Sequence, residues 1–598
     1  MNERSKLIRI GGAAGFWGES DIGLPQFLTQ GDLDYVVFDY LAEITMSVMA
    51  RARAKDPGAG YATDFVTAVL KPNLSEVARQ GVKLVSNAGG VNPLACAAAI
   101  EALIAEAGLD LKVAVITGDD LLGKAEALAG QGHAEMFSGD AFPDPNAVAS
   151  VNAYLGAFPI ARALSEGADI VITGRCVDSA VTLGICVHEF GWGREDWDLL
   201  SAGSLAGHIL ECGPQATGGN YTDWEDVADT LHEIGYPIAE ITGDGVFTVS
   251  KPDGTGGTVT VGTVGEQMLY EIGDPLAYML PDVTCDFSEV GLEQVAPDRV
   301  RVTGAKGRAA PATYKVSTTY SDGWRAGVVW FFVGEDAGRK GRAFADAALK
   351  RANAKLRAMN LPAFDEELIE VIGDGSSYGS AVASGDVAVK IAVKHRDARA
   401  AGLILKESTG LGLSAPPGLS GFSGSRPKPS PVVRLFSFLI PKGEVPIRLH
   451  INGEPVDLGT EPIFDQSSDP TPRAPETPGD AQVSVPLQRL AFARSGDKGN
   501  KANIGILPRD PAYGPYIWAA LNEAEIAKRF AHYLDGAAPR VERFWMPGTG
   551  AMNILLHDVL GGGGVASLRN DPQAKTYGQI LLRAEIPVPA SVAESLAE

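Results

Sequence analysis

The chain has 598 residues, which is too long for a single hydrophobic core, so we expect two to four domains. Its composition, 45% hydrophobic and 21% charged, is typical of a folded protein and excludes wholesale disorder. The net charge of -23 argues against a general binder of nucleic acid or of an anionic membrane, because the field of the protein repels phosphate. A local basic pocket is compatible with this charge.

The sequence also bears on compartment and on cysteine chemistry. Its first residues include no apolar run of signal-peptide length, and no stretch approaches the roughly 20 apolar residues of a membrane span, so we expect a cytoplasmic protein. The five cysteines are odd in number and form no CxxC pair, which argues against a disulfide framework and a thiolate zinc site. No spacing of His, Asp and Glu predicts another metal site, and we expect no tightly bound cofactor.

The first 200 residues alternate short β-branched runs with glycine-rich turns and stretches of helical period. Buried strands joined by helices predict a mostly parallel, doubly wound α/β sheet, which we place at residues 1–204. We expect strands at 6–12, 34–40, 83–90, 112–118 and 168–175, and helices within 63–80, 93–108 and 152–167.

The pattern changes further along the chain. Residues 205–466 alternate strand patterns with acidic and glycine turns around one helical stretch at 341–359, which predicts an α+β region packed on the first domain. Within it, residues 412–431 are rich enough in Gly, Pro and Ser to predict a long loop or lid. Residues 467–482 have almost no apolar side chains and predict a linker, and residues 483–598 predict a small α/β domain.

Unusual residues follow each of the five expected strands. In an open parallel sheet, ligands bind outside the carboxyl ends of the strands, where loops diverge and helix N-termini point their amides outward. Asp119, Asp120 and Asn92 are also well placed as helix N-caps, which is the commoner role. Glu43 and Arg175 have no routine capping role, so function and an internal ion pair both stay open for them. The strand-end residues that we assign to a site are Gly11, Gly12, Glu43, Asn87, Gly89, Gly90, Arg175 and Asp178.

The first of these turns raises the question of a dinucleotide site. Gly12, Gly15 and the later Asp39 match the back half of the GxGxxG fingerprint and its acid, but Ile10 occupies the place of the first glycine. This mismatch argues against NAD or FAD. Close approach of a ligand and a tight turn both explain the Gly11–Gly12 doublet.

A second cluster, HILECGPQATGGNYTDW at 208–224, places hydrogen-bonding side chains around three glycines. It is typical of a site loop and equally of a structured turn. Cys212 would need an activating base to act as a nucleophile, and His208 is the nearby candidate. From this cluster we assign to the site Glu211, Gln215, Thr217 and Asn220.

A third cluster, ARSGDKGNKANIGI at 493–506, has glycines around Ser495, Asp497 and Lys498. Its amides and ammonium group can hold an anion, and a charged hairpin turn explains it equally well. The order of residues differs from a Walker A loop. Further on, the four glycines Gly561–Gly564 are costly to order, so we expect them to make close contacts or to be mobile.

Taken together, these motifs resemble the acyclic terpene utilisation protein family AtuA, formerly a domain of unknown function. RIGGAAGFWGES, VSNAGGVNP, DIVITGRCVDSA, ECGPQATGGN, YEIGDP and ARSGDKGNKANIG occur in order along nearly the whole chain, including the small C-terminal domain that the family often carries. The resemblance implies a role in the breakdown of branched acyclic terpenes, alongside enzymes that act on acyl-CoA thioesters. It implies a pathway and no agreed set of catalytic residues.

We therefore expect an enzyme that adds or removes water, or cleaves a carbon–carbon bond, on a branched acyl-CoA, with coenzyme A as part of the substrate. Such chemistry requires a base, amides for an oxyanion and cations for the CoA phosphates. Glu43 or Glu211 can serve as the base, the Asn87–Gly90 turn can supply amides, and Arg175 or Lys498 can meet phosphate. The loop at 412–431 can close over the substrate.

Two alternatives stay open at this point. The chain can be a non-catalytic subunit or adaptor of an acyl-CoA enzyme, in which case its polar motifs would be spread over one face rather than meet in a pocket. It can also be a nicotinamide-dependent oxidoreductase that binds its cofactor in another mode. The glycine-rich turns also suggest a homo-oligomer.

Overall fold

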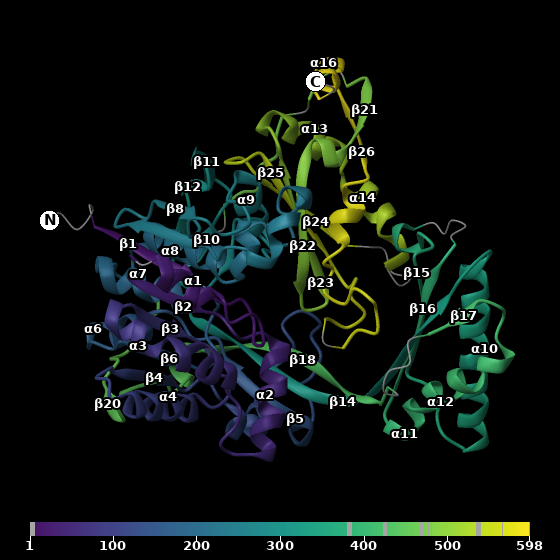
Figure 1. Ribbon diagram of the computed structural model, residues 1–598, viewed down its shortest axis with the longest axis horizontal. Coiled ribbons are helices and arrows are strands. Elements are labelled where there is room, and N and C mark those ends of the chain that lie inside the picture. Colours follow the sequence, from purple (N-terminus) through teal and green to yellow (C-terminus); the bar gives the residue numbers. More distant parts are fainter. Residues whose placement is uncertain are drawn as a thin grey trace.

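The computed structural model describes residues 6–30, 32–379, 385–421, 427–465, 470–476, 478–479, 481–533, 540–564 and 566–596. Three parts can be distinguished in Figure 1: a large α/β body at the left, a lobe that carries α10 at the right, and a C-terminal domain at the top between them. Part of the predicted loop at 412–431 and part of the predicted linker at 467–482 fall outside the described residues.

The body is built on five parallel strands in the order β1-β2-β3-β6-β4. All five coincide with strands expected from the sequence, because each is a short β-branched run that is buried on both faces. Their bounds are Leu7–Gly12, Tyr35–Phe38, Lys83–Ser86, Ile170–Thr173 and Val113–Thr117, in the order of the sheet.

Antiparallel strands extend this sheet at both edges to eleven strands, so the sheet as a whole is mixed. Beyond β1 lie β7, β8, β12 and β11, and beyond β4 lie β19 and β20. Residues on both sides of position 204 therefore contribute to one sheet. The bounds of these added strands are Ile238–Thr242, Phe247–Ser250, Arg299–Thr303, Gly291–Ala296, Arg448–Ile451 and Glu454–Val456.

Helices cover both faces of the parallel strands. Alternate strand residues point to opposite faces, so Val37 packs with α6, α7 and α8, whereas Val36 packs with α1 to α4. The helices on the Val36 face are α1 (Gly23–Gln30), α2 (Glu43–Lys55), α3 (Lys71–Gln80) and α4 (Pro93–Ala107), and those on the Val37 face are α6 (Phe158–Ser165), α7 (Ala180–Phe190) and α8 (Trp197–Leu210).

One expected helix is wrong in part. Residues 152–167 were expected to be helical, but Val148–Ala153 form strand β5 and the helix begins only at Phe158. The residues of β5 alternate small and polar side chains, which gave no clear strand signal, and β5 is stabilised by antiparallel pairing with a distant strand, β14.

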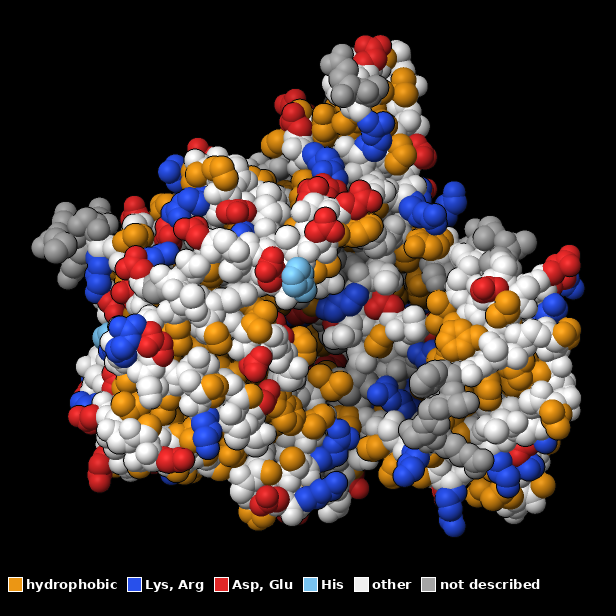
Figure 2. Space-filling view, in the orientation of Figure 1, with side chains coloured by type: hydrophobic (Ala, Val, Ile, Leu, Met, Phe, Trp, Pro, Cys, Tyr) orange, Lys and Arg blue, Asp and Glu red, His pale blue; other side chains and the backbone are white. Residues whose placement is uncertain are grey.

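The strand β14, Thr313–Phe332, links the body to the lobe. Its first half pairs with β5 and with β18 (Ser430–Pro441), and its second half pairs with β16 (Val387–His395). In the lobe, β15 (Glu366–Ile372) adds to β16, and α10 (Ala337–Ala358), α11 (Ala398–Ala401) and α12 (Leu403–Gly410) cover one face of the sheet. Figure 2 shows a hollow between the body, the lobe and the C-terminal domain, with acidic side chains at its depth and Lys and Arg side chains beside it.

The C-terminal domain is an antiparallel sheet in the order β22-β23-β25-β24 with helices against it. It docks on helix α9 (Val261–Leu269) of the body, where glycines permit close approach: a Cβ atom at Gly505 would lie 2.3 Å from Leu269. Its strand bounds are Ala491–Lys498, Lys501–Pro508, Ala551–Leu556 and Val541–Met546, with an outer pair β21 (Val483–Pro486) and β26 (Glu585–Val588); its helices are α13 (Gly514–Ala520), α14 (Glu523–Arg529), α15 (Tyr577–Leu581) and α16 (Ala590–Ser595).

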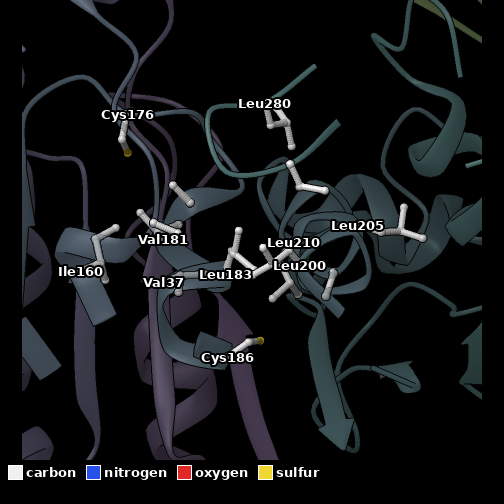
Figure 3. Close-up of a cluster of buried hydrophobic side chains, with 14 of the residues drawn as sticks. Val37, Ile160, Cys176, Val181, Leu183, Cys186, Leu200, Leu205, Leu210 and Leu280 are labelled. Atoms are coloured by element: carbon white, nitrogen blue, oxygen red, sulfur yellow. The ribbon is translucent and has the colours of Figure 1, made fainter. Parts of the chain in front are cut away.

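One of the two cores of the body lies between the sheet and helices α7 and α8. Leu183 of α7 and Leu200 and Leu210 of α8 point toward one another above the strand that carries Val37 (Figure 3). Cys176 and Cys186 belong to the same apolar cluster, and all five cysteines are free. Four of the five are buried as small apolar side chains, which explains why their spacing has no disulfide or metal pattern.

Candidate active site

The carboxyl ends of β2 and β3 meet through a buried Asp–Asn pair. The amide nitrogen of the Asn87 side chain donates a hydrogen bond to Asp39, and the Asn87 side-chain oxygen accepts one from the backbone N–H of Tyr40 at 2.7 Å. Burial raises the pKa of Asp39 well above its usual value, and nearby Asp178 raises it further. Burial and the Asp178 carboxylate thus both disfavour the charged form of Asp39.

The ends of β4 and β6 meet in the same way. Asp119 accepts hydrogen bonds from the backbone N–H of Arg175 and from the side chain of Asn152, both at 2.9 Å. Burial raises the pKa of Asp119 to about 7. Together with the pair at β2 and β3, these contacts bring four of the five parallel strand ends to one edge of the sheet, as the parallel arrangement requires.

Arg175 is the buried cation of this edge. Its residue is 3% exposed, its Nη1 lies 2.6 Å from Asp178 Oδ1, and its guanidinium carbon lies 4.2 Å from the ring centroid of Tyr154. The Nε atom of Arg175 is buried without a hydrogen-bond partner among the described residues. A guanidinium in this setting can be retained only because the carboxylates and the aromatic face around it offset the cost of removing it from water.

Glu43, at the start of α2, lies on the other side of Tyr154. The Tyr154 hydroxyl donates to Glu43 Oε1 at 2.7 Å, and the Lys315 ammonium group lies 3.8 Å from the same oxygen. Burial alone would raise the pKa of Glu43, but Lys315, Arg175 and the Tyr154 hydrogen bond outweigh it and lower the pKa to about 2. Glu43 is thus a stable anion and a weak base, which argues against it as the general base.

Glu211 and His208 form an acid–base pair at the end of α8. The Nδ1 atom of His208 lies 2.9 Å from Glu211 Oε1, and His208 is almost fully buried. Burial raises the pKa of Glu211 despite His208, and Glu211 in turn raises the pKa of His208 against the effect of burial. For neighbouring Cys212, burial raises the pKa well above that of a free thiol, so it remains protonated and unsuited as a nucleophile.

The C-terminal domain supplies a further set of charges. Glu271 lies between two of its lysines, 3.3 Å from Lys498 and 3.7 Å from Lys575. Burial alone would raise the pKa of Glu271, but these lysines lower it. Two asparagines hold this segment: Asn503 accepts a hydrogen bond from the Glu271 N–H at 2.8 Å, and Asn553 donates to the carbonyl oxygens of Ile272 and Gly273 at 2.6 Å.

These groups act on one another across the domain contact. Burial alone would lower the pKa of Lys498, but Glu271, Tyr278 and Asp178 raise it well above its usual value. Burial raises the pKa of Asp497 to about 7, and Glu271 and Glu43 contribute to the increase. Because charges influence pKa values over short distances, the strand ends and the C-terminal domain share one site.

The site reaches solvent although its groups are desolvated. The exposed side-chain fraction is 31% for Glu43, 37% for Lys315 and 41% for Lys498, yet burial is the largest influence on the pKa of each. This combination is expected of side chains on the wall of a deep hollow, in agreement with the hollow of Figure 2. Two other hollows, of about 560 and 720 Å³, lie beside α1, and none of the candidate active-site residues lines them.

The predicted glycines have packing roles. A Cβ atom at Gly11 would lie 2.6 Å from the Phe27 ring, and one at Gly12 would lie 2.6 Å from the carbonyl oxygen of Leu210. Both glycines of this doublet thus permit close packing of protein atoms against β1. In the second turn, Gly89 donates its N–H to Thr173 and Gly90 donates to Asn87.

The expectation that the Asn87–Gly90 turn supplies amides to an oxyanion is therefore wrong. All four of its backbone N–H groups already donate within the protein: Asn87 to Phe38, Ala88 to the Ser86 hydroxyl, Gly89 to Thr173 and Gly90 to Asn87.

Four other predicted residues lie beside the site. The Arg494 guanidinium, stacked 4.6 Å from the Tyr270 ring centroid, donates to the side chain of Gln215 and to the carbonyl oxygen of Asn220. Gln215 and Asn220 thus help to dock the C-terminal domain. The Thr217 hydroxyl donates to the carbonyl oxygen of Gly235 and the Ser495 hydroxyl donates to that of Ala574, both at 2.6 Å, so each hydroxyl ties its turn to a segment distant in the sequence.

Sequence reasoning missed several members of the cluster, chiefly Tyr154, Lys315, Glu271 and Lys575. Tyr154 follows the strand that was expected to be a helix, and Lys315 is one of many charged residues in alternating strands. Glu271 had a signal, because it lies in the YEIGDP motif that carried the family resemblance.

Within the described part of the chain, no group of His, Cys, Asp and Glu is arranged to hold a metal ion. No helix among the described residues is long and apolar enough to cross a membrane.

Two protein-family models match separate parts of the chain. Residues 8–451 match the model of the acyclic terpene utilisation family protein AtuA, and residues 485–587 match the AtuA ferredoxin-like domain. The chain therefore belongs to the AtuA family, which places it in the utilisation of acyclic terpenes. Neither the curated proteins nor the solved structures include a match.

Proposed function

We propose that the protein is an enzyme of acyclic terpenoid catabolism that adds or removes water, or cleaves a carbon–carbon bond, on a branched acyl-CoA thioester. The observation that carries the proposal is the convergence of paired acid–base groups from distant parts of the chain: Glu43 with Lys315, Arg175 with Asp178, His208 with Glu211, and Glu271 with Lys498. A protein that served only as an adaptor would have no need to desolvate so many ionisable groups at one hollow.

Glu211 is the proposed general base. Abstraction of a proton next to a thioester carbonyl requires a base whose pKa lies near the working pH, and burial moves the pKa of Glu211 in that direction. His208 orients the Glu211 carboxylate through the 2.9 Å contact. Glu43, with its pKa of about 2, instead keeps Lys315 and Tyr154 in place.

The cations around Glu211 stabilise the enolate oxygen that forms when the proton leaves. Arg175, Lys315 and Lys498 lie in the same cluster, where low solvent content strengthens their field. In the dehydration direction, the proton on the substrate's α-carbon moves to Glu211 and the β-hydroxyl leaves as water with a proton from an acid. Asp497, whose pKa is about 7, can hold that proton.

Ligand binding tests the substrate class. Thermal unfolding of the purified protein would be followed with free CoA, short branched acyl-CoA esters, NAD and NADP at equal ionic strength. A ligand at 100 times its dissociation constant stabilises the native state by about 2.7 kcal/mol. We expect acyl-CoA esters, and free CoA through its phosphate groups, to give this shift, and NAD and NADP to give none. A shift with NAD or NADP only, or with none of the ligands, would contradict the proposal and favour the oxidoreductase or the adaptor.

The E211Q variant tests the mechanism. It removes the base while keeping the shape of the side chain, so turnover of the acyl-CoA ester that binds should fall by about 10²–10⁴-fold while binding persists. The matched control is E233Q, because Glu233 is exposed and lies outside the cluster. If E211Q turned over the ester within a few-fold of the wild-type rate, Glu211 would not be the base.

A further inference from the structure

A second group of basic side chains lies on the inner face of the lobe sheet. Arg325 of β14 pairs with Lys394 of β16 in register, and Lys390 is four residues from Lys394, so all three point to one face. Arg325 also pairs with Ser430 of β18, and Arg434 is four residues from Ser430, so it shares that face. We call Arg325, Lys390, Lys394 and Arg434 the basic face; α10 covers the opposite side of the sheet.

Three cations of the basic face pair with acids: Glu366 lies 2.5 Å from Lys394, Glu370 lies 3.7 Å from Lys390, and Asp322 pairs with Arg434. Arg325 donates to the carbonyl oxygen of Ser567 in the C-terminal domain at 3.3 Å.

Arg569 of the same domain adds a fifth cation. Its guanidinium donates to the carbonyl oxygens of Val559 and Tyr533, and its charge acts on Glu370. In a chain with a net charge of -23, five cations along one face are a local concentration of basic groups, even though three of them pair with acids. Their mutual repulsion is evident at Lys390, where burial and Arg325 lower the pKa of the ammonium group despite Glu370.

The glycine-rich loop Gly561–Gly564 connects the basic face to the candidate active site. Gly561, Gly562 and Gly563 have positive φ angles of 65°, 94° and 94°, which favour glycine. A Cβ atom at Gly562 would lie 3.3 Å from Arg434 Nη1, and one at Gly564 would lie 3.0 Å from Asp497 Oδ2. The loop therefore contacts a cation of the basic face at one end and an acid of the site at the other.

We infer that the basic face and the Gly561–Gly564 loop bind the phosphate groups of the substrate's coenzyme A, so that its pantetheine arm reaches the site past Gly564 and Asp497. This inference rests on the proposed function and assigns a part of the substrate to a surface that the acid–base cluster does not use. Guanidinium and ammonium groups next to a glycine backbone are the groups that recognise phosphate. Figure 2 shows Lys and Arg side chains between the hollow and the lobe, on the path that such a ligand requires.

The test compares R325Q/K390Q with R339Q/R342Q in the full chain. The control removes the same charge from the exposed outer surface of α10. Dissociation constants would be measured for CoA, for 3′,5′-ADP, for ATP and for a branched acyl-pantetheine. We expect R325Q/K390Q to weaken CoA and 3′,5′-ADP at least tenfold and to leave acyl-pantetheine unchanged, while the control stays within twofold of wild type. If R325Q/K390Q unfolds, R325Q alone is measured, with R325K expected to restore binding in part.

Several results would overturn the inference. One is that CoA binds the wild type and R325Q/K390Q equally well. Another is that neither CoA nor 3′,5′-ADP binds the wild type, and a third is that ATP binds as tightly as 3′,5′-ADP while CoA does not bind. The failure of the proposed function is distinct: CoA would bind through the basic face, but no acyl-CoA ester would be turned over.

Discussion

The two halves of the candidate active site are built in different ways. The strand-end half, with Asp39, Asp119 and Arg175, consists of residues that directly follow buried parallel strands, and its hydrogen bonds join neighbouring strand ends. The C-terminal half, with Glu271 and Lys498, depends on the docking of a separate domain onto α9. The first half is thus determined by the topology of one sheet, and the second by the complementarity of two surfaces.

The largest effect should come from removing Arg175, the buried cation of the strand-end half. R175M leaves Asp178 and Glu43 without their guanidinium partner in a desolvated site, so the free energy of unfolding should fall by roughly 3–5 kcal/mol. Urea unfolding followed by tryptophan fluorescence would measure it, with exposed R342M of α10 as the control. A loss below about 1 kcal/mol, the value of a surface pair, would show that Arg175 is not held as described.

A smaller effect should come from separating the C-terminal half. G505A places a methyl group 2.3 Å from Leu269 and forces β23 away from α9, which should cost about 1–3 kcal/mol and separate Lys498 from Glu271. The melting temperature and the turnover of the acyl-CoA ester should fall together. G123A is the control, because a Cβ atom there meets open space. An unchanged melting temperature and turnover in G505A would mean that docking does not complete the site.

The smallest effect should be on the pH dependence of stability, and it should come from the strand-end half alone, through Asp119. Burial raises the pKa of Asp119 to about 7 from its ordinary value of 3.8, so the native state binds this proton more tightly than the unfolded state between about pH 4 and pH 7. The stability that Asp119 contributes is therefore lost as the pH rises through this range. The decline in melting temperature from pH 4.5 to 7.5 should be smaller in D119N than in the wild type and in exposed D229N. Equal declines in all three proteins would contradict the raised pKa.

The contrast also explains which features were predictable from the sequence. The five parallel strands, and the polar and charged residues at their carboxyl ends, were predictable. A buried strand has a local sequence signature, and the topology brings the carboxyl ends of parallel strands together. Glu43 and Arg175 were recognised because a charge after an apolar strand has no routine role. Arg175 lies against Asp178, and Glu43 lies against Tyr154 and Lys315.

Roles that depend on distant partners were not predictable. Gly12 was read as a possible ligand contact, but its neighbour is Leu210 at the end of α8, almost 200 residues away. In the same way, the assignment of Glu43 as a base failed because its pKa is set by Lys315 from a strand near the middle of the chain. The contact between Glu271 and Lys498 required the position of a whole domain, and only the YEIGDP motif hinted at it.

The most direct test of the account is a crystal structure of the full chain with S-isobutyl-CoA, a thioether that cannot be turned over. The account predicts the thioether sulfur in the hollow between the two halves, next to Glu211 and Lys498, and the phosphate groups against Arg325 and Lys390. A ligand bound in one of the hollows beside α1, away from both halves, would contradict the assignment of the site.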